Sequence, residues 1–214
     1  MGEAMIKKYS NIRKIILPNK RINIFIISIL FLGVILGSVY ANIIGLNDRN
    51  LVIDKIKVFV DNINSNSLNT FLVFKNSVGI NFSYMLFIWI LGMSIIGIIF
   101  NIILLFLKGF IFGFSIASFI ITYGIKGIVL SIIYLIFGQL LNIIFITILA
   151  IYSILFSVKL IKNIINKDKD QKFSVFIKNY FIILVICILV ALISSVSETF
   201  ILPALIKLVI KLYI

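Results

Sequence analysis

The sequence lacks histidine altogether and contains one cysteine, two prolines and seven acidic residues among its 214 positions. Without histidine, no Ser–His or Cys–His nucleophile can be assembled, and a zinc site loses a principal nitrogen ligand. The lone cysteine, Cys187, has no second cysteine in the chain for a disulfide. A phosphate-binding loop of the G-x-x-x-x-G-K-[ST] type is also missing. We therefore expect a protein that is not an enzyme and that needs no cofactor or metal.

Charge is nearly absent from five long stretches of the chain. These stretches are residues 22–46, 80–107, 109–125, 127–158 and 179–206. An apolar run of about 18 residues or more is long enough to cross the hydrocarbon core of a bilayer as a helix. Hydrophobic residues make up 62% of the chain, well above the roughly 45–50% of soluble domains. The sequence thus predicts an all-α, polytopic membrane helix bundle of about five transmembrane helices.

The segments between the runs are too short for a soluble domain of ordinary size. We expect a basic cytoplasmic N-terminal segment, 1–21, followed by one integral membrane domain, 22–214, whose last span covers about 179–202. The connections predicted between spans are an external loop, 47–79, and a basic cytoplasmic loop, 159–178. The first run exceeds the apolar core of a cleaved signal peptide, so it is interpreted as a retained signal-anchor.

The net charge of +13 is concentrated beside the apolar runs. Short basic flanks of membrane helices face the cytoplasm, so this charge indicates topology rather than nucleic-acid binding. With both basic clusters cytoplasmic, four spans separate them and a fifth places the C-terminus outside. The clusters are Lys7, Lys8, Arg13, Lys14, Lys20 and Arg21, and then Lys159, Lys162, Lys167, Lys169, Lys172 and Lys178.

The loop 47–79 contains an amphipathic pattern. Its apolar residues recur at helical spacing: Val52, Ile56, Phe59, Val60 and Ile63. Such a helix can lie on the outer membrane surface or dock a partner outside the membrane, and the pattern leaves both interpretations open.

Small residues four positions apart are expected to bring helices together, because close backbone contact supplies association energy in lipid. They form two stripes: Gly33, Gly37 and Ala41 in the first run, and Gly109, Gly113 and Ala117 in the third. Each stripe can face another span of this chain or a partner protein.

Several residues are expected to turn or break the helices. Lys108, before Gly109, predicts a tight inner turn between the second and third spans, and Lys126 with Gly127 predicts the matching outer turn. Run 127–158 is too long for a straight span, and Gly138 is its expected break. Pro203 is expected to bend or end the last span.

Glu198 is the one acidic residue within the long apolar runs. An ionisable side chain at that place is by default a functional candidate. It can make a specific structural or partner contact, take part in ion coupling, or reach interfacial water. Gln139 and Asn142 lie near the middle of run 127–158, and a polar site formed by Gln139, Asn142 and Glu198 would indicate a small transporter or channel subunit.

The order of several short motifs resembles the stage II sporulation protein M family of endospore-forming Firmicutes. The motifs are Phe74-Lys75-Asn76-Ser77, Ile88-Trp89-Ile90-Leu91-Gly92 with Gly97, Lys108-Gly109-Phe110-Ile111-Phe112-Gly113-Phe114, Gly124-Ile125-Lys126-Gly127-Ile128, and Glu198 before Pro203. Where family members usually carry a proline in the fourth span, this chain has Phe137-Gly138-Gln139.

The resemblance implies a non-catalytic scaffold in the cell membrane, at the sporulation septum and the engulfing mother-cell membrane. Its implied partners are the peptidoglycan hydrolases of the engulfment complex, sporulation proteins D and P, together with membrane lipid. The transporter or channel subunit is the alternative, and a protein that organises anionic lipid through its lysine clusters is a third hypothesis.

Overall fold

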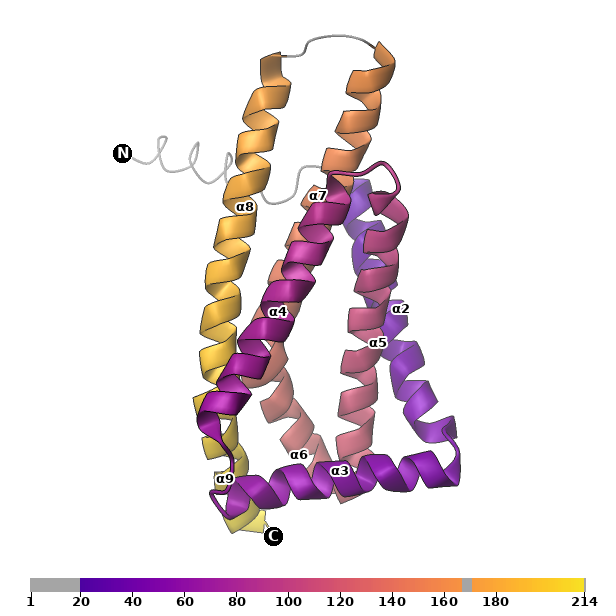
Figure 1. Ribbon diagram of the computed structural model, residues 1–214. Coiled ribbons are helices and arrows are strands. Elements are labelled where there is room, and N and C mark those ends of the chain that lie inside the picture. The colour runs from indigo at the N-terminus through magenta and orange to yellow at the C-terminus, as the bar shows by residue number, and fades with distance from the viewer. Residues whose placement is uncertain (1–19, 167–170, 214) are drawn as a thin grey trace, which may run out of the picture.

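The computed structural model describes residues 20–166 and 171–213, and these parts of the chain form helices without any strand (Figure 1). Most of the predicted N-terminal basic segment, and Lys167 and Lys169 of the predicted cytoplasmic loop, lie outside the described residues. In chain order the elements are α2 (Lys20–Ile43), α3 (Leu46–Asn64), α4 (Thr70–Gly92), α5 (Gly97–Tyr123), α6 (Ile125–Ile133), η1 (Tyr134–Gln139), α7 (Leu140–Asn166), α8 (Gln171–Val196), η2 (Ser197–Ile201) and α9 (Leu202–Tyr213).

Five helical stretches are long and apolar enough to cross a membrane, which confirms the predicted membrane bundle. They are Lys20–Ile43, Thr70–Gly92, Gly97–Tyr123, Ile125–Ile165 and Val175–Lys211. The start of α2, the α4–α5 turn, the end of α7 and the start of α8 gather at one end, which we call the lysine-rich end (Figure 1). The other end, which we call the α3 end, holds α3, the α5–α6 turn and the end of α9. The chain therefore crosses the bundle an odd number of times, as the charge pattern predicts; which end is cytoplasmic stays a prediction.

The turn between the second and third spans does not lie at Lys108, so the predicted spans 80–107 and 109–125 are wrong. The reversal occupies Met93–Ile96, where the Gly97 amide donates to the Ser94 carbonyl at 3.2 Å. A Cβ on Gly97 would lie 1.6 Å from the Leu91 carbonyl oxygen, so only glycine fits this reversal. Ser94 and Gly97 thus form the turn without a charged residue. Helix α5 continues unbroken through Lys108.

The turn between α5 and α6 also differs slightly from the prediction. It is made by Gly124, whose φ of +59° favours a residue without a Cβ. Lys126 and Gly127 follow within the first turn of α6. A Cβ on Gly127 would lie 2.2 Å from the Phe119 carbonyl oxygen, so this glycine permits close contact with α5 rather than making the turn.

The long fourth and fifth spans each contain a short π-helical segment. In the fourth span this segment is η1, which includes Gly138, the residue at which a break is predicted. Figure 1 shows α6 and α7 meeting at an angle there. In the fifth span η2 precedes α9, and Pro203 is the second residue of that helix. A π-helical segment widens one turn, and such segments often lie at functional positions.

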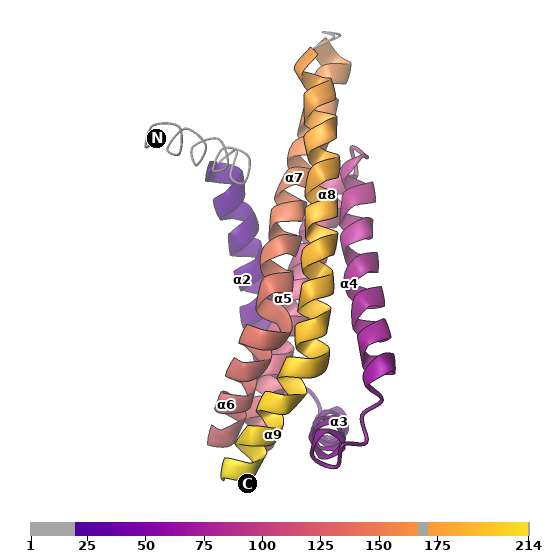
Figure 2. The ribbon, with the colours of Figure 1, turned by 90° about the vertical axis from the view of Figure 1, so that its left-hand side faces the viewer.

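The predicted external loop 47–79 contains the expected amphipathic helix, and its last part already belongs to the second span. Its first part is α3, which lies across the end of the bundle, nearly perpendicular to the spans (Figures 1 and 2). The amphipathic pattern is therefore used within the chain. Val60 and Ile63 pack in one apolar cluster with residues of α5, α6 and α9, among them Phe119, Leu130 and Ile206. Its second part is the beginning of α4, which starts already at Thr70.

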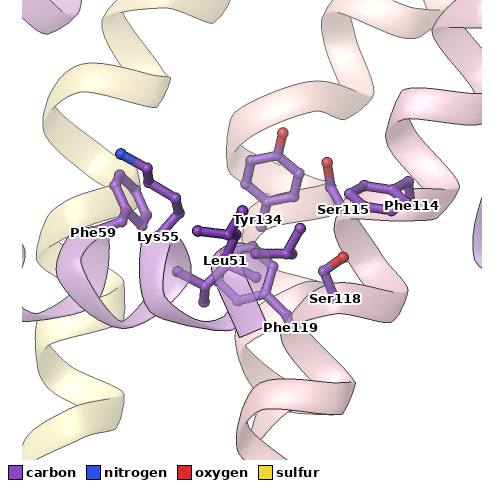
Figure 3. Close-up of a pocket in the computed structure, with 10 residues that line it drawn as sticks. Leu51, Lys55, Phe59, Phe114, Ser115, Ser118, Phe119 and Tyr134 are labelled. Atoms are coloured by element: carbon purple, nitrogen blue, oxygen red, sulfur yellow. The ribbon is translucent and has the colours of Figure 1, made fainter. Parts of the chain in front are cut away.

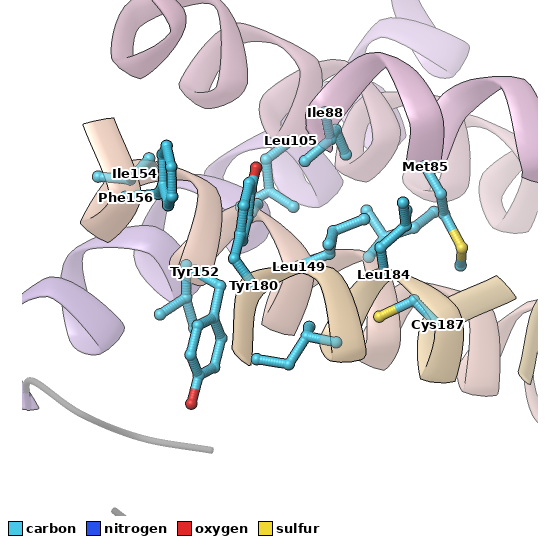
Figure 4. Close-up of a cluster of buried hydrophobic side chains, with 14 of the residues drawn as sticks. Met85, Ile88, Leu105, Leu149, Tyr152, Ile154, Phe156, Tyr180, Leu184 and Cys187 are labelled. Carbon is cyan, nitrogen blue, oxygen red and sulfur yellow. The ribbon is translucent and has the colours of Figure 1, made fainter. Parts of the chain in front are cut away.

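The main core lies between α4, α7 and α8, toward the lysine-rich end (Figure 4). Tyr180 stacks on Phe156 with ring centroids 4.6 Å apart, and on Trp89 at 5.7 Å. Ser153 donates to the Ile88 carbonyl, and Ser157 donates to the Gly92 carbonyl, each at 2.8 Å. These hydroxyl groups of α7 hold the end of α4 next to the turn that leads into α5.

The two glycine stripes face each other across the α2–α5 interface. A Cβ on Gly37 would lie 2.0 Å from the Phe110 carbonyl oxygen, and one on Gly113 would lie 2.0 Å from that of Val34. Corresponding contacts join Gly33 to Phe106 and Gly109 to Leu30. The stripes thus serve packing within this chain, and the alternative in which they face a partner protein is not what the structure shows.

Candidate functional site

Glu198 belongs to η2 and accepts hydrogen bonds on both carboxylate oxygens. Its Oε2 accepts from the Ser77 hydroxyl at 2.6 Å, and its Oε1 accepts from Gln139 Nε2 at 3.1 Å. Ser77 lies on α4 and Gln139 ends η1, so one carboxylate connects three spans. The Ser77 contact is short for a hydrogen bond between two oxygens, within the range of a hydroxyl that donates to a carboxylate.

Gln139 also connects the acid to a base. Its Oε1 accepts from Lys108 Nζ at 3.4 Å, while its Nε2 donates to Glu198. The Lys108 ammonium also lies 5.6 Å from the centre of the Tyr84 ring on α4. The Gln139 amide therefore turns its carbonyl toward Lys108 and its N–H groups toward Glu198. This is the favourable orientation of an amide dipole between a basic and an acidic side chain.

A layer of uncharged polar side chains continues the network across the bundle. Asn142 on α7 donates to Asn81 Oδ1 on α4, and Asn81 Nδ2 donates to Ser195 on α8 at 3.3 Å. Ser77 Oγ lies 3.1 Å from Ser195 Oγ and so joins this layer to Glu198. Asn81, Asn142 and Ser195 are buried. We call the seven residues Ser77, Asn81, Lys108, Gln139, Asn142, Ser195 and Glu198 the polar network.

Lys108 of the polar network lies far from both ends of its helix. Lys108 is eleven residues after Gly97 and fifteen before Tyr123, or about 16 Å and about 22 Å at 1.5 Å per residue. Charged groups at such depth are costly in a bilayer unless they are paired and hydrogen-bonded. The two π-helical segments contribute one member each, since Gln139 ends η1 and Glu198 lies in η2.

One carbonyl of the polar network has no donor. Asn142 Oδ1 is buried and receives no hydrogen bond from the described residues, as is also true of Asn101 Oδ1 outside the network. A buried polar atom without a partner is uncommon and costs free energy. Within the part of the chain that the structure describes, no three His, Cys, Asp or Glu side chains gather as metal ligands would.

The structure brings together three of the residues that the sequence singled out, Gln139, Asn142 and Glu198, in the polar network. It adds Lys108, which was expected at a turn. Gly33, Gly37, Gly109 and Gly113 lie apart from the network in the α2–α5 interface. Lys126 and Gly127 lie at the α3 end, and Gly138 and Pro203 adjoin the network residues Gln139 and Glu198 along the chain.

Sequence reasoning missed three members as site residues, namely Ser77, Asn81 and Ser195. A usable signal was present, because Asn81 and Asn142 are amides inside apolar runs, where each polar group needs a partner. What the sequence does not show is that residues as distant as Ser77 and Glu198 meet.

The fold and the network define a class: a multi-pass helical membrane protein with a hydrogen-bonded acid–amide–base network inside its bundle. The sequence model of the family described as "Stage II sporulation protein M" matches residues 24–203, most of the chain. The chain belongs to the stage II sporulation protein M family and is a sporulation membrane protein. No curated protein and no solved structure gives a match.

Proposed function

We propose that this protein is a non-catalytic membrane scaffold that recruits peptidoglycan-degrading partners to the septal membrane during engulfment in sporulation. The observation that carries the proposal is α3, a helix laid across one end of the bundle. Its apolar face packs on α5 and α9, and its opposite face is exposed. A helix held in this way presents a fixed surface beyond the ends of the spans.

The charge distribution supports an external position for α3. Lys20 at the start of α2, Lys162 at the end of α7 and Lys178 near the start of α8 lie at the opposite end of the bundle. By the positive-inside rule that end faces the cytoplasm, so α3 would face the cell wall, where wall hydrolases act.

The exposed face of α3 has the composition of a contact surface for a folded partner. Asp54, Lys57, Val58 and Asp61, which we call the outer stripe, are exposed and recur at helical spacing. Val58 is 55% exposed. A partner could bury the apolar Val58 side chain, and the surrounding charges of both signs could orient that partner. Specific interfaces combine these two features.

The polar network supports the same role, because a scaffold must hold its surface in place. Hydrogen bonds of Glu198, Gln139 and Asn81 join α4, α5, α7 and α8 in a fixed arrangement. These hydrogen bonds fix the positions of the spans relative to one another, and α3 packs against the spans that are fixed in this way.

The test is co-purification from sporulating cells with sporulation proteins D and P as the readout. Replacing the outer stripe by Asp54→Lys, Val58→Glu and Asp61→Lys should lower recovery of the hydrolases by about tenfold or more, the loss of roughly 1.4 kcal/mol of binding free energy. Lys126→Glu, an exposed charge reversal at the same end, should leave recovery intact. Equal recovery with the outer-stripe variant, at equal membrane abundance, would contradict the proposal.

A small transporter or channel subunit is the second candidate. It is favoured by the convergence of Gln139, Asn142 and Glu198 and by the unpaired Asn142 carbonyl, which offers an acceptor to a polar solute or ion. Solute or ion flux into vesicles containing the purified protein alone, abolished by Asn142→Leu, would support this function over the scaffold.

A further inference from the structure

A groove opens between α3 and the side of the bundle (Figure 3). Leu51, Lys55 and Phe59 line it from α3, and Phe114, Ser118 and Tyr134 line it from the opposite side. Its volume of 380 Å³ falls within the roughly 300–1,000 Å³ of small-molecule sites. None of the outer-stripe residues lines the groove; Asp54, Lys57 and Asp61 lie on the other side of α3, and Val58 lies at the border between the two faces.

With α5 spanning the bilayer, the groove would lie near the boundary between the lipid headgroups and the hydrocarbon. On α5, Ser118 is five residues and Phe114 is nine residues from the end of the helix at Tyr123. At 1.5 Å per residue these positions lie about 8 Å and about 14 Å inside the span. The groove thus extends from the level of α3 into the outer part of the apolar layer.

The walls of the groove are chiefly aliphatic and aromatic. Of the polar groups at its deeper part, Ser115 donates to the Ile111 carbonyl at 2.8 Å, and the Tyr134 hydroxyl lies beside Ser115 (Figure 3). An apolar hollow with few free polar groups is a poor site for water. Next to a bilayer, a lipid acyl chain is available to fill such a hollow and matches its apolar walls.

Positive charge stands at the level where a lipid headgroup would lie. Lys55 is exposed at the rim of the groove. A smaller hollow shares Val52, Phe114 and Ser118 with the groove, and Arg49 lines it. Lysine and arginine side chains at a membrane surface attract anionic headgroups, and arginine binds phosphate with two parallel hydrogen bonds.

We infer that the groove binds one anionic phospholipid, with an acyl chain between α3 and α5 and the phosphate at Lys55 and Arg49. The lipid fills the space under α3 and attaches this helix to the membrane surface as well as to the bundle. The inference does not depend on the hydrolase-binding role, since the residues of α3 that line the groove are not those of the outer stripe.

The experiment uses the full chain in nanodiscs containing phosphatidylglycerol or phosphatidylcholine, followed by release and native mass spectrometry of retained lipid. The intact protein should retain phosphatidylglycerol preferentially. Lys55→Gln and Arg49→Gln should each lower retention about fivefold, as expected for one cationic side chain near the headgroups. Lys57→Gln on the outer stripe is the matched control and should change nothing.

A second measurement avoids dependence on the folding of variants. Phosphatidylglycerol with a photoreactive group on its acyl chain should label peptides of α3 and of α5 around Phe114–Phe119 in the unmodified protein. Equal losses with Lys55→Gln and Lys57→Gln, or equal retention of phosphatidylcholine, would overturn the inference. So would photolabelling of the unmodified protein that misses both α3 and Phe114–Phe119.

Discussion

Glu198 and Lys108 are charged side chains held far from both ends of their helices, and Gln139 stands between them. Both side chains are half-buried, and removing one partner leaves the other without compensation inside the bundle, which is more damaging than removing both. Single and double substitutions of Glu198 and Lys108 can measure this difference.

We expect Glu198→Gln and Lys108→Met each to lower the free energy of unfolding by about 2–4 kcal/mol. The double variant should lose at least about 1 kcal/mol less than the sum of the two, because it leaves no unpaired charge. Denaturant titration in detergent micelles measures this, with the fluorescence of Trp89, the one tryptophan of the chain, as the probe. Lys57→Met, at an exposed position, is the control and should shift stability by less than about 0.5 kcal/mol. Strict additivity would refute the coupling.

At the scale of the elements, the α2–α5 interface depends on glycine because backbone meets backbone there. Gly37 and Gly79 both lie within spans, but a Cβ on Gly37 would lie 2.0 Å from the Phe110 carbonyl oxygen, whereas one on Gly79 would meet nothing within 4 Å. The same substitution should therefore have opposite effects at the two sites.

We expect Gly37→Ala to destabilise the protein by about 1–3 kcal/mol through overpacking. Gly79→Ala should be neutral or stabilising by up to about 1 kcal/mol, since alanine favours the helix over glycine. Thermal unfolding of the two purified variants in the same detergent compares their stabilities with that of the unmodified protein. Similar destabilisation by both substitutions would show that close packing at Gly37 is not the cause.

The turn predicted at Lys108 was the largest error made from the sequence, and the helix contacts explain it. A lysine followed by glycine was interpreted as a turn, because a charge in an apolar run ordinarily marks its end. Lys108 instead stays inside α5, since Gln139 and Glu198 approach it from two other spans. The true turn contains no charge, and its signal was the spacing of Gly92 and Gly97 around Ser94.

At the scale of the whole molecule, the two ends of the bundle differ in charge and in form. The lysine-rich end consists of helix ends and a short turn, whereas the α3 end is covered by a helix that lies across it (Figure 2). This difference is the basis for placing partner contacts on one side of the membrane.

We expect the α3 end to face outward. In a Cys187→Ala background, Asp61→Cys on α3 should react with a membrane-impermeant maleimide in intact protoplasts, and Lys162→Cys near the end of α7 should react only after lysis. Both positions are exposed in the structure, so a lack of labelling reports sidedness rather than burial. Labelling of position 162 but not 61 would invert the topology and remove the basis for contact with wall enzymes.

The amino-acid sequence was enough to predict a five-span helical membrane protein, because a bilayer permits few alternatives to long apolar helices. It also indicated the helix-packing glycines, since small residues allow close helix contact in lipid. It singled out Glu198 as a functional candidate, which stays a prediction. Only the tertiary structure decided which residues surround Glu198, that Lys108 is one of them through Gln139, and that α3 folds back on the bundle. Those outcomes depend on contacts between different helices, from 31 positions apart for Lys108 and Gln139 to 121 for Ser77 and Glu198. Local patterns carry no information about which distant helix faces will meet.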